Sequence, residues 1–245
     1  MLSALARHYV GERRHYLLVA PPLIDGALGP EAARSAGFRP TEWPGWASGV
    51  IDLTASLDDL RRGLGRSWRT RLNKAERAGP DVAQGCDEEL FEHVLAGHAR
   101  AVAEKGFATT LDGRFLRVLQ ELLPPERKMV SFVAFEDALP IGWTLFARYA
   151  STAEYIVGGV TETGRRRDAN RVLLWRALAA MKDAGVRTFD MGGMDDANTP
   201  PGIYDFKRAM GAAPYRLEGE LEADSGRLLD RLVRHRVRAA RARGA

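Results

Sequence analysis

The sequence predicts an α/β protein built on one mixed sheet, and three features of its second half support that prediction. Three strand-like runs, MVSFVAFED, PIGWTLFARYA and TAEYIVGGV, follow one another at 129–160 with short turns between them, which is typical of an antiparallel meander. The helix expected at 168–184 carries apolar residues around nearly its whole circumference and should be largely buried. A short strand, VRTFDMGG, follows it. This order, without a G-x-G-x-x-G or G-x-x-x-x-G-K-[ST] pattern, argues against a doubly wound nucleotide-binding fold.

The first part of the chain predicts short elements separated by turns. Residues 16–20 read as a buried strand, 30–37 as a short helix ending at a glycine, and 49–53 as a second strand. Thr54 or Ser56 can cap the helix that begins at LDDLRRGL, whose first turn contains two aspartates that favour the positive end of the helix dipole.

The next helix, expected at 66–78, has one apolar and one basic side. At about 100° per residue, its apolar side gathers Leu64, Trp68, Leu72 and Ala75. Its basic side gathers Arg66, Arg69, Lys74 and Arg77. A basic face of this kind can follow a phosphate backbone, although it is also an ordinary solvent-exposed face.

Helices are also expected at 87–105 and 112–123, the second capped by Asp112. After the VRTFDMGG strand, a short helix is expected at 204–210. A last strand, PYRLEGELE, is expected at 214–222.

Composition narrows the class of protein. The 245 residues are 45% apolar and 28% charged, which is ordinary for a globular protein. A single cysteine, Cys86, excludes a disulfide framework and a cysteine-rich metal site. No apolar run approaches the roughly 20 residues needed to cross a bilayer, and the N-terminal stretch is interrupted by charge too early for a secretory signal. We therefore expect a cytoplasmic protein without a membrane span.

The basic charge is concentrated at one end. Residues 226–245 carry seven arginines against one acid, and the remaining residues carry 29 basic against 31 acidic side chains. A basic arm suits a polyanion such as RNA. An amphipathic closing helix explains the same residues, because five aliphatic side chains between 228 and 237 give it an apolar stripe.

Three stretches carry a resemblance to a known family. They are SWRTRLNKAERAG at 67–79, AEYIVGGV followed by LLWRALAAMKDAGVRTFDMGG at 153–160 and 173–193, and GIYDFKRAMGA at 202–212. Their order resembles the Fem family of tRNA-dependent aminoacyltransferases, within the Gcn5-related N-acyltransferase (GNAT) superfamily.

The resemblance implies a GNAT-like mixed sheet with flanking helices, with one complete acyltransferase-like half and an abbreviated N-terminal half. We expect the abbreviated half with the basic helix at 1–85, the acyltransferase domain at 86–222 and a basic C-terminal helix or tail at 223–245. Fem ligases that build peptidoglycan bridges are longer. A compact relative that adds one amino acid to a small amine fits this length better.

The segment before the central helix indicates the acyl donor. Acyl-CoA-dependent enzymes of this fold cradle the pyrophosphate with a [QR]-x-x-G-x-[GA] loop, where side chains would block the approach. With Arg165 aligned to the leading position, Asp168 and Asn170 stand at the two small positions. The run Arg165, Arg166 and Arg167 suits a phosphodiester backbone, or is an arginine-rich surface loop. The pattern favours aminoacyl-tRNA as co-substrate, with no cofactor.

The resemblance also implies the catalytic residues. Lys207 matches the lysine of the family's Phe-Lys motif and is expected at the donor ester or its oxyanion, with Phe206 as a wall of that site. Asp190 closes a strand and either orients the attacking amine or is a turn residue. Tyr155 and Tyr204 line the acceptor pocket or simply pack.

Trp68, on the apolar side of the basic helix, is expected at the same acceptor pocket. A metal site is not expected, because no histidine stands near the aspartates at 190, 195 and 196 and acid-plus-glycine loops are common turns.

Three functions follow. The first is transfer of an amino acid from aminoacyl-tRNA to the amine of a small molecule or peptide, a natural-product or cell-wall precursor. The second is acyl-CoA-dependent N-acyl transfer, which the fold permits. The third is a non-catalytic RNA-binding relative that uses its basic helix and tail.

Overall fold

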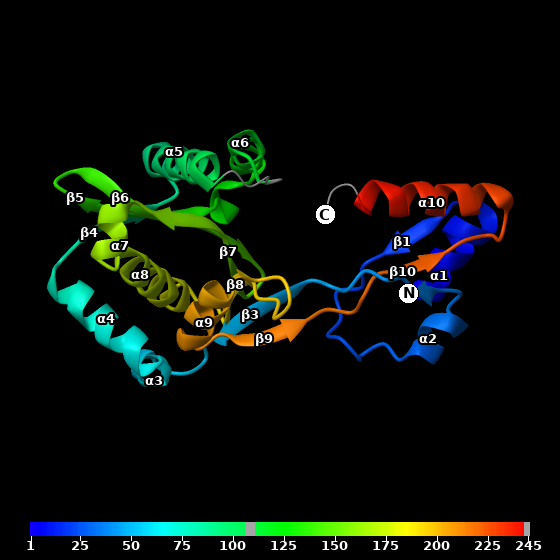
Figure 1. Cartoon of the computed structure of the whole chain (residues 1–245), viewed down its shortest axis with the longest axis horizontal. Coiled ribbons are helices and arrows are strands. Elements are labelled where there is room, and N and C mark those ends of the chain that lie inside the picture. The colour runs from blue at the N-terminus through cyan, green and yellow to red at the C-terminus, as the bar shows by residue number, and fades with distance from the viewer. Residues whose placement is uncertain (106–110, 243–245) are drawn as a thin grey trace. The chain divides into compact units, whose positions relative to one another are not determined.

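The computed structural model describes residues 1–105 and 111–242 (Figure 1). Contacts divide the chain into two compact units, Ser48–Pro214 and a smaller one that combines Met1–Ala47 with Tyr215–Ala245. This division groups residues by contact alone, so the domain boundaries expected near residues 85 and 222 stay a prediction.

The larger unit is built on a seven-stranded mixed sheet. Its strands, in spatial order, are β4 (Asp81–Gly85), β5 (Val130–Glu136), β6 (Leu139–Tyr149), β7 (Thr152–Val160), β8 (Thr188–Gly193), β3 (Ala47–Asp52) and β9 (Ala213–Arg216). Neighbours from β4 to β7 are antiparallel, β8 joins β7 in parallel, and β3 is antiparallel to β8. The predicted meander and mixed sheet are therefore confirmed. Strand β4 was not predicted from the sequence.

Most helices described in this unit begin and end within about three residues of their predicted bounds, and the exception, at 162–166, was not predicted. The described helices are α3 (Leu57–Gly63), α4 (Arg66–Arg77), α5 (Glu88–Lys105), α6 (Gly113–Leu122), α7 (Glu162–Arg166), α8 (Ala169–Asp183) and α9 (Pro201–Ala209), and a 3₁₀ turn, η2, lies at Pro125–Arg127. Ser56, rather than Thr54, caps α3 by accepting a bond from the Asp59 backbone amide at 3.1 Å. Asp112 caps α6 in the same way, at 2.7 Å from the Phe115 amide.

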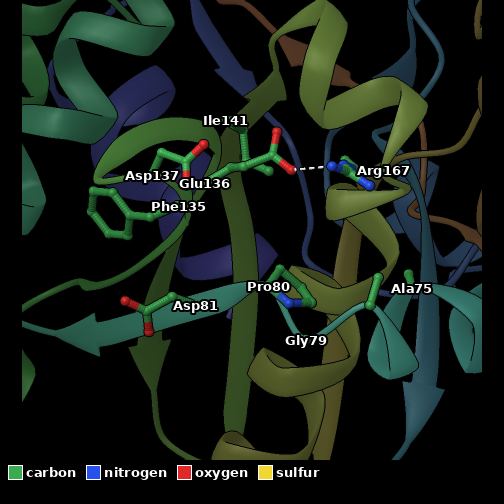
Figure 2. A pocket seen from close by; sticks show the side chains of 10 residues that line it. Ala75, Gly79, Pro80, Asp81, Phe135, Glu136, Asp137, Ile141 and Arg167 are labelled. Carbon is green, nitrogen blue, oxygen red and sulfur yellow. Dashed lines mark ion pairs between the residues drawn. The ribbon is translucent and has the colours of Figure 1, made fainter.

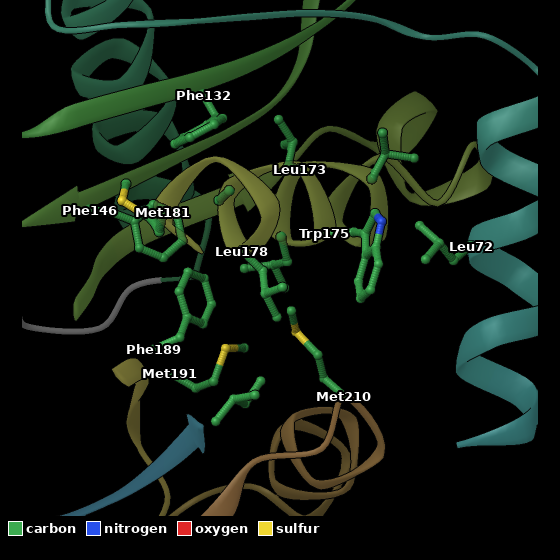
Figure 3. Packing of buried hydrophobic residues seen from close by; sticks show 14 of the residues in the cluster. Leu72, Phe132, Phe146, Leu173, Trp175, Leu178, Met181, Phe189, Met191 and Met210 are labelled. Atoms are coloured by element: carbon green, nitrogen blue, oxygen red, sulfur yellow. The ribbon is translucent and has the colours of Figure 1, made fainter. Parts of the chain in front are cut away.

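Helices cover both faces of the sheet, and the strands alternate their side chains between two cores. In β5, Phe132 and Ala134 point into the core shared with α4 and α8, whereas Val133 points into the core shared with α5 and α6. Figure 3 shows α8 in the first of these cores, with Leu173 and Leu178 packed among residues of the sheet. The expectation that α8 is largely buried is confirmed.

The smaller unit holds a three-stranded antiparallel sheet in the order β1 (Leu17–Val19), β10 (Leu221–Ala223), β2 (Arg39–Pro40). Its helices are α1 (Leu2–Leu5), the π-helical η1 (Ala6–Glu12), α2 (Pro30–Ser35) and α10 (Leu228–Ala242). A small separate core fills it, centred on Ala33, Phe38, Leu221 and Ala223.

The prediction of one last strand at 214–222 is wrong. The segment forms two strands that belong to different sheets, β9 and β10. Between them the backbone bonds to loop residues instead, from the Leu217 amide to the Trp46 carbonyl and from the Glu218 amide to the Leu23 carbonyl, each at 2.8 Å. These bonds divert the chain before it can continue in one ladder.

Across the described ranges, no helix combines the length and the apolar character that crossing a membrane requires.

Candidate active site

The parallel strands β7 and β8 separate after a short stretch of pairing, and the candidate site lies where they separate. They pair over only three residue pairs, the last being Glu154 with Asp190, although β7 continues to Val160. A bulge shifts the register of β7 against β6 at Ile156, because Phe146 pairs with Tyr155 and Leu145 with Val157. The backbone beyond the last pair is therefore not matched to β8.

Asp190 lies at this separation and is 4% exposed. Its Oδ1 accepts bonds from the Ser48 hydroxyl and from the Gly192 amide, the latter at 2.8 Å. Gly192 has a positive φ of 72°, so a glycine suits the turn that this bond closes. Asp190 thus anchors the end of β8, and its role toward a substrate stays a prediction.

Lys207 reaches the same place from α9. Its Nζ donates to the Gly193 carbonyl at 2.7 Å. Burial lowers the pKa of Lys207, and the Asp190 carboxylate opposes that shift. An ammonium has three donors, and the Gly193 carbonyl accepts from one of them.

Glu154 and Tyr149 join this group and were missed by the sequence analysis. Burial raises the pKa of Glu154, a bond from the Tyr149 hydroxyl opposes the shift, and the Asp190 carboxylate adds to it. Burial also raises the pKa of Tyr149 to about 12. An acid between Ala153 and Tyr155, inside a predicted strand of the meander, was the available signal. We call Glu154, Asp190 and Lys207 the strand-end cluster.

Phe206 faces a different neighbourhood from Lys207. Its ring centroid lies 5.8 Å from that of Trp68, and the Arg171 guanidinium lies 5.2 Å from Phe206 and 5.7 Å from Trp68. Trp68 is 2% exposed and belongs to the core. Arg171 therefore links α8 to the aromatic residues of α4 and α9.

Asp168 holds that arginine in place. Its carboxylate accepts from Arg71 Nε at 3.0 Å and forms ion pairs with both Arg71 and Arg171. Asp168 itself stands immediately before α8 with a left-handed φ of 56°. A buried carboxylate therefore occupies the start of the central helix, where it connects α4 to α8.

The predicted arginine loop is instead largely helical. Thr161 caps α7 by accepting from the Gly164 amide at 3.1 Å, so the segment closes into a short helix. A Cβ at Gly164 would lie 1.9 Å from the Ile141 carbonyl oxygen, so only glycine fits this close packing. The expectation of an open loop here is wrong.

The three arginines of this segment are all exposed, and two are paired. Arg165 is exposed, Arg166 pairs with Glu162 at 2.6 Å, and Arg167 pairs with Glu136 at 2.6 Å. Figure 2 shows the second pair at a pocket of about 250 Å³ that also contacts the end of α4 and the β5–β6 turn.

The basic side of α4 also faces outward in part. Arg66, Lys74 and Arg77 are exposed, whereas Arg69 is half-buried and donates to the Arg62 carbonyl at 2.8 Å. These residues lie apart from the strand-end cluster in the sequence and on other elements, and their contact with RNA stays a prediction.

The two tyrosines expected at an acceptor pocket are half-buried. Tyr155 packs edge-on against Phe146 at 5.6 Å, and burial raises its pKa to about 12. Tyr204 packs against the larger core from α9. Within residues 1–105 and 111–242, no group of three His, Cys, Asp or Glu side chains is placed to hold a metal ion.

With this geometry established, comparison with known proteins identifies the family. The profile of the acetyltransferase (GNAT) domain matches residues 62–208. The chain belongs to this family. It is a GNAT-type acyltransferase, and the predicted GNAT-like sheet is confirmed. A comparison with proteins of curated function finds no match.

Solved structures similar to this GNAT protein share its fold at low identity. The crystal structure of FemX matches with a TM-score of 0.81 and 14% identity, over 95% of this chain and 77% of that one. The C-terminal domain of a protein assigned as a lysylphosphatidylglycerol synthetase, from Agrobacterium fabrum, matches at 0.59 and 14%, over 94% and 75%. A tandem GNAT protein from the clavulanic acid biosynthesis pathway matches at 0.50 and 19%, over 92% and 68%.

Proposed function

We propose that this GNAT protein transfers an amino acid from aminoacyl-tRNA to an amine and forms an amide bond. The observation that carries the proposal is the strand-end cluster, which combines a half-buried ammonium with two carboxylates where β7 and β8 separate. Such a cluster provides both a cation for a developing oxyanion and an acid–base group for an amine.

Asp168 supports tRNA rather than acyl-CoA as donor. The N-terminus of a helix favours a pyrophosphate, yet here a buried carboxylate stands at the start of α8 and engages Arg71 and Arg171. A CoA pyrophosphate would be repelled by that charge and would find both arginines already paired. The sequence resemblance to the Fem family implies the same donor, and the fold is shared with FemX.

The chemistry assigns one task to each member of the cluster. The acceptor ammonium loses one proton to Glu154, and the amine attacks the ester carbonyl carbon. Lys207 stabilises the oxyanion of the tetrahedral intermediate through donors that Gly193 does not use. The C–N bond forms, the ester C–O bond breaks, and the ribose oxygen leaves with the second proton from nitrogen.

Asp190 keeps this arrangement together by fixing the end of β8 and by favouring the charged form of Lys207. Its charge also raises the pKa of Glu154, which makes that carboxylate a stronger base. We assign the acceptor pocket to Tyr155 and Tyr204, which are half-buried, whereas Phe206 packs against Trp68 and Arg171. The acceptor is the amine of a small molecule or peptide, a natural-product or cell-wall precursor.

Exposed basic residues contribute to tRNA binding in this proposal. Arg165, Arg66, Lys74 and Arg77 are exposed, so they can contact phosphates. Arg166 and Arg167 would first have to exchange an acid partner for a phosphate, and we expect smaller effects from their removal. Since the donor is made in the cytoplasm, we place the reaction there.

Acyl-CoA-dependent N-acylation is the second candidate, and membership of the acetyltransferase (GNAT) domain family favours it. It uses the same amine site but needs phosphate contacts at the start of α8. A non-catalytic RNA-binding role would leave the strand-end cluster without a task.

The test compares two variants of α9. Lys207→Ala should abolish transfer from charged tRNA to an amine panel. Arg208→Ala, one residue further and paired with Asp205 at the surface, should keep it. Ribonuclease should abolish transfer by the wild type. Transfer from acyl-CoA that survives ribonuclease would support the second candidate, and RNA binding without transfer from either donor would support the third.

A further inference from the structure

The C-terminal helix α10 carries an exposed apolar surface. Leu228, Leu229 and Leu232 are 77%, 64% and 62% exposed. At about 100° per residue they fall on one side of the helix, and Arg236 lies between them on the same side. We call these four residues the leucine–arginine face.

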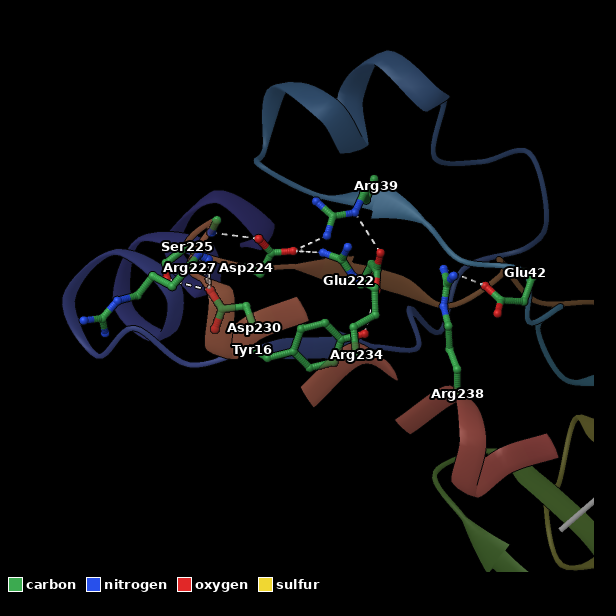
Figure 4. A network of polar contacts seen from close by, with 11 residues as sticks. Tyr16, Arg39, Glu42, Glu222, Asp224, Ser225, Arg227, Asp230, Arg234 and Arg238 are labelled. Atoms are coloured by element: carbon green, nitrogen blue, oxygen red, sulfur yellow. Dashed lines mark hydrogen bonds and ion pairs between the residues drawn. The ribbon is translucent and has the colours of Figure 1, made fainter. Parts of the chain in front are cut away.

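The opposite side of α10 fixes the helix to the smaller unit, and so determines which side is exposed. Its arginines form ion pairs: Arg234 with Glu222 and Asp224, Arg238 with Glu42, and Arg241 with Glu220. Figure 4 shows Arg234 and Arg238 turned toward these acids. Asp230, which is buried, caps the start of the helix by accepting from the Ser225 and Arg227 amides. The leucines therefore point away from this network.

The arginines of α10 and of the residue before it fall into two groups, those paired with acids and those without an acidic partner in the described ranges. The paired group is neutralised by acids, whereas Arg227, Arg231 and Arg236 are exposed, and no acidic side chain of the described ranges lies within ion-pair distance of their guanidinium groups. Of these three, Arg236 lies among the leucines, Arg231 lies at the edge of that side next to Leu228, and Arg227 lies on the attached side.

We propose that the leucine–arginine face binds the surface of an anionic lipid bilayer. Aliphatic side chains flanked by arginines on an amphipathic helix suit the boundary between lipid headgroups and acyl chains, where leucines enter the apolar layer and guanidinium groups bind phosphates. RNA accounts for the arginines but not for the leucines, because a phosphate backbone offers no apolar surface for three exposed aliphatic side chains. The proposal does not depend on the identity of the acyl donor.

The test is co-sedimentation of the full-length protein with vesicles of phosphatidylcholine alone or with about one-third phosphatidylglycerol. We expect binding to the anionic vesicles only. The triple variant Leu228→Ser, Leu229→Ser, Leu232→Ser should weaken it at least about a hundredfold, because each leucine contributes through the apolar area that leaves water. Arg231→Gln with Arg236→Gln should weaken it about thirtyfold, since each basic residue near an anionic surface contributes roughly fivefold.

A control variant distinguishes binding through the leucine–arginine face from nonspecific hydrophobic adsorption to vesicles. Leu122 and Leu139 are 79% and 68% exposed on the larger unit, so Leu122→Ser with Leu139→Ser removes two comparably exposed leucines elsewhere and should not change vesicle binding. All variants should keep the melting temperature of the wild type, because the substituted side chains are exposed.

Three results would overturn the proposal. The first is vesicle binding that the leucine variant retains in full. The second is no vesicle binding, together with tRNA binding that falls when the two arginines are removed, which would assign the face to RNA. The third is a wild-type dimer that the leucine variant converts to a monomer without loss of vesicle binding, which would assign the face to a second copy of the chain.

Discussion

Asp168 combines a strained backbone with a buried charge, and its replacement by glycine tests why an acid stands at the start of α8. Asp168→Gly removes the carboxylate that ties Arg71 to Arg171 and keeps the left-handed backbone conformation. We expect it to lower stability and, at the same time, to create affinity for coenzyme A.

The size of the stability change follows from the two arginines. The Arg171 side chain is 12% exposed, and a buried charge that loses its partner costs about 3–5 kcal/mol. The Arg71 side chain is 49% exposed and can return to water at little cost. Glycine adopts a φ of 56° without the backbone strain of other residues, which returns about 1 kcal/mol to the free energy of unfolding. The net loss should be about 2–4 kcal/mol.

Urea denaturation measures the first effect and isothermal titration with coenzyme A the second. The variant should bind coenzyme A at least about tenfold more tightly than the wild type, because two arginines and the helix N-terminus become available to its phosphates. Asp168→Asn, which keeps the shape and tolerates a left-handed backbone, is the control and should lose less stability. Unchanged stability and unchanged coenzyme A affinity in Asp168→Gly would refute this reasoning.

Three further predictions concern packing and charge. In Gly97→Ala, the new methyl group would lie 2.4 Å from the Trp143 ring, so the free energy of unfolding from thermal denaturation should fall by at least about 2 kcal/mol. Gly113→Ala, the control, has open space around the new methyl group and should show no such fall. Glu154→Gln should raise the melting temperature at pH 7–8 and not at pH 4. The reason is that the pKa of Glu154 is raised, so the folded state disfavours the ionised carboxylate, which is present only at the higher pH. An equal rise in melting temperature at both pH values would contradict the burial of that charge. Arg171→Lys keeps the charge but loses the planar contact with two aromatic rings, and should cost about 1–2 kcal/mol of unfolding free energy in urea; no loss would dismiss the contact.

Local signals were sufficient for much of the fold. Helix caps such as Ser56 and Asp112, the alternating side chains of β5 and the apolar circumference of α8 each act over a few residues, so the sequence displays them directly. The five-residue helix α7 was not predicted because it contains Gly164, and glycine disfavours a helix. The reason for a glycine at this position, its close approach to the Ile141 carbonyl, lies on a distant strand and cannot be read from the local sequence. The division of 214–222 depends on bonds to distant loops, which no local pattern encodes.

The candidate site was predictable only in part. Lys207 and Asp190 were found through a motif and a strand end, and the structure brings them together. Glu154 was missed because its proximity to Asp190 comes from the register of two strands joined by a long connection. The arginines were expected to be available to RNA, but Arg167 is paired with Glu136, which lies far from it in sequence. Charge on one strand or helix can be read from sequence, whereas its neutralisation by another element cannot.

The measurement that tests the central claim most directly is a single-turnover transfer assay with two donors at equal concentration. A radiolabelled amino acid on purified tRNA and radiolabelled acetyl-CoA are each incubated with the enzyme and a panel of amines. We predict amide product from the charged tRNA only, lost in Lys207→Ala and kept in Arg208→Ala. Product from acetyl-CoA alone, or transfer from tRNA that does not depend on Lys207, would contradict it.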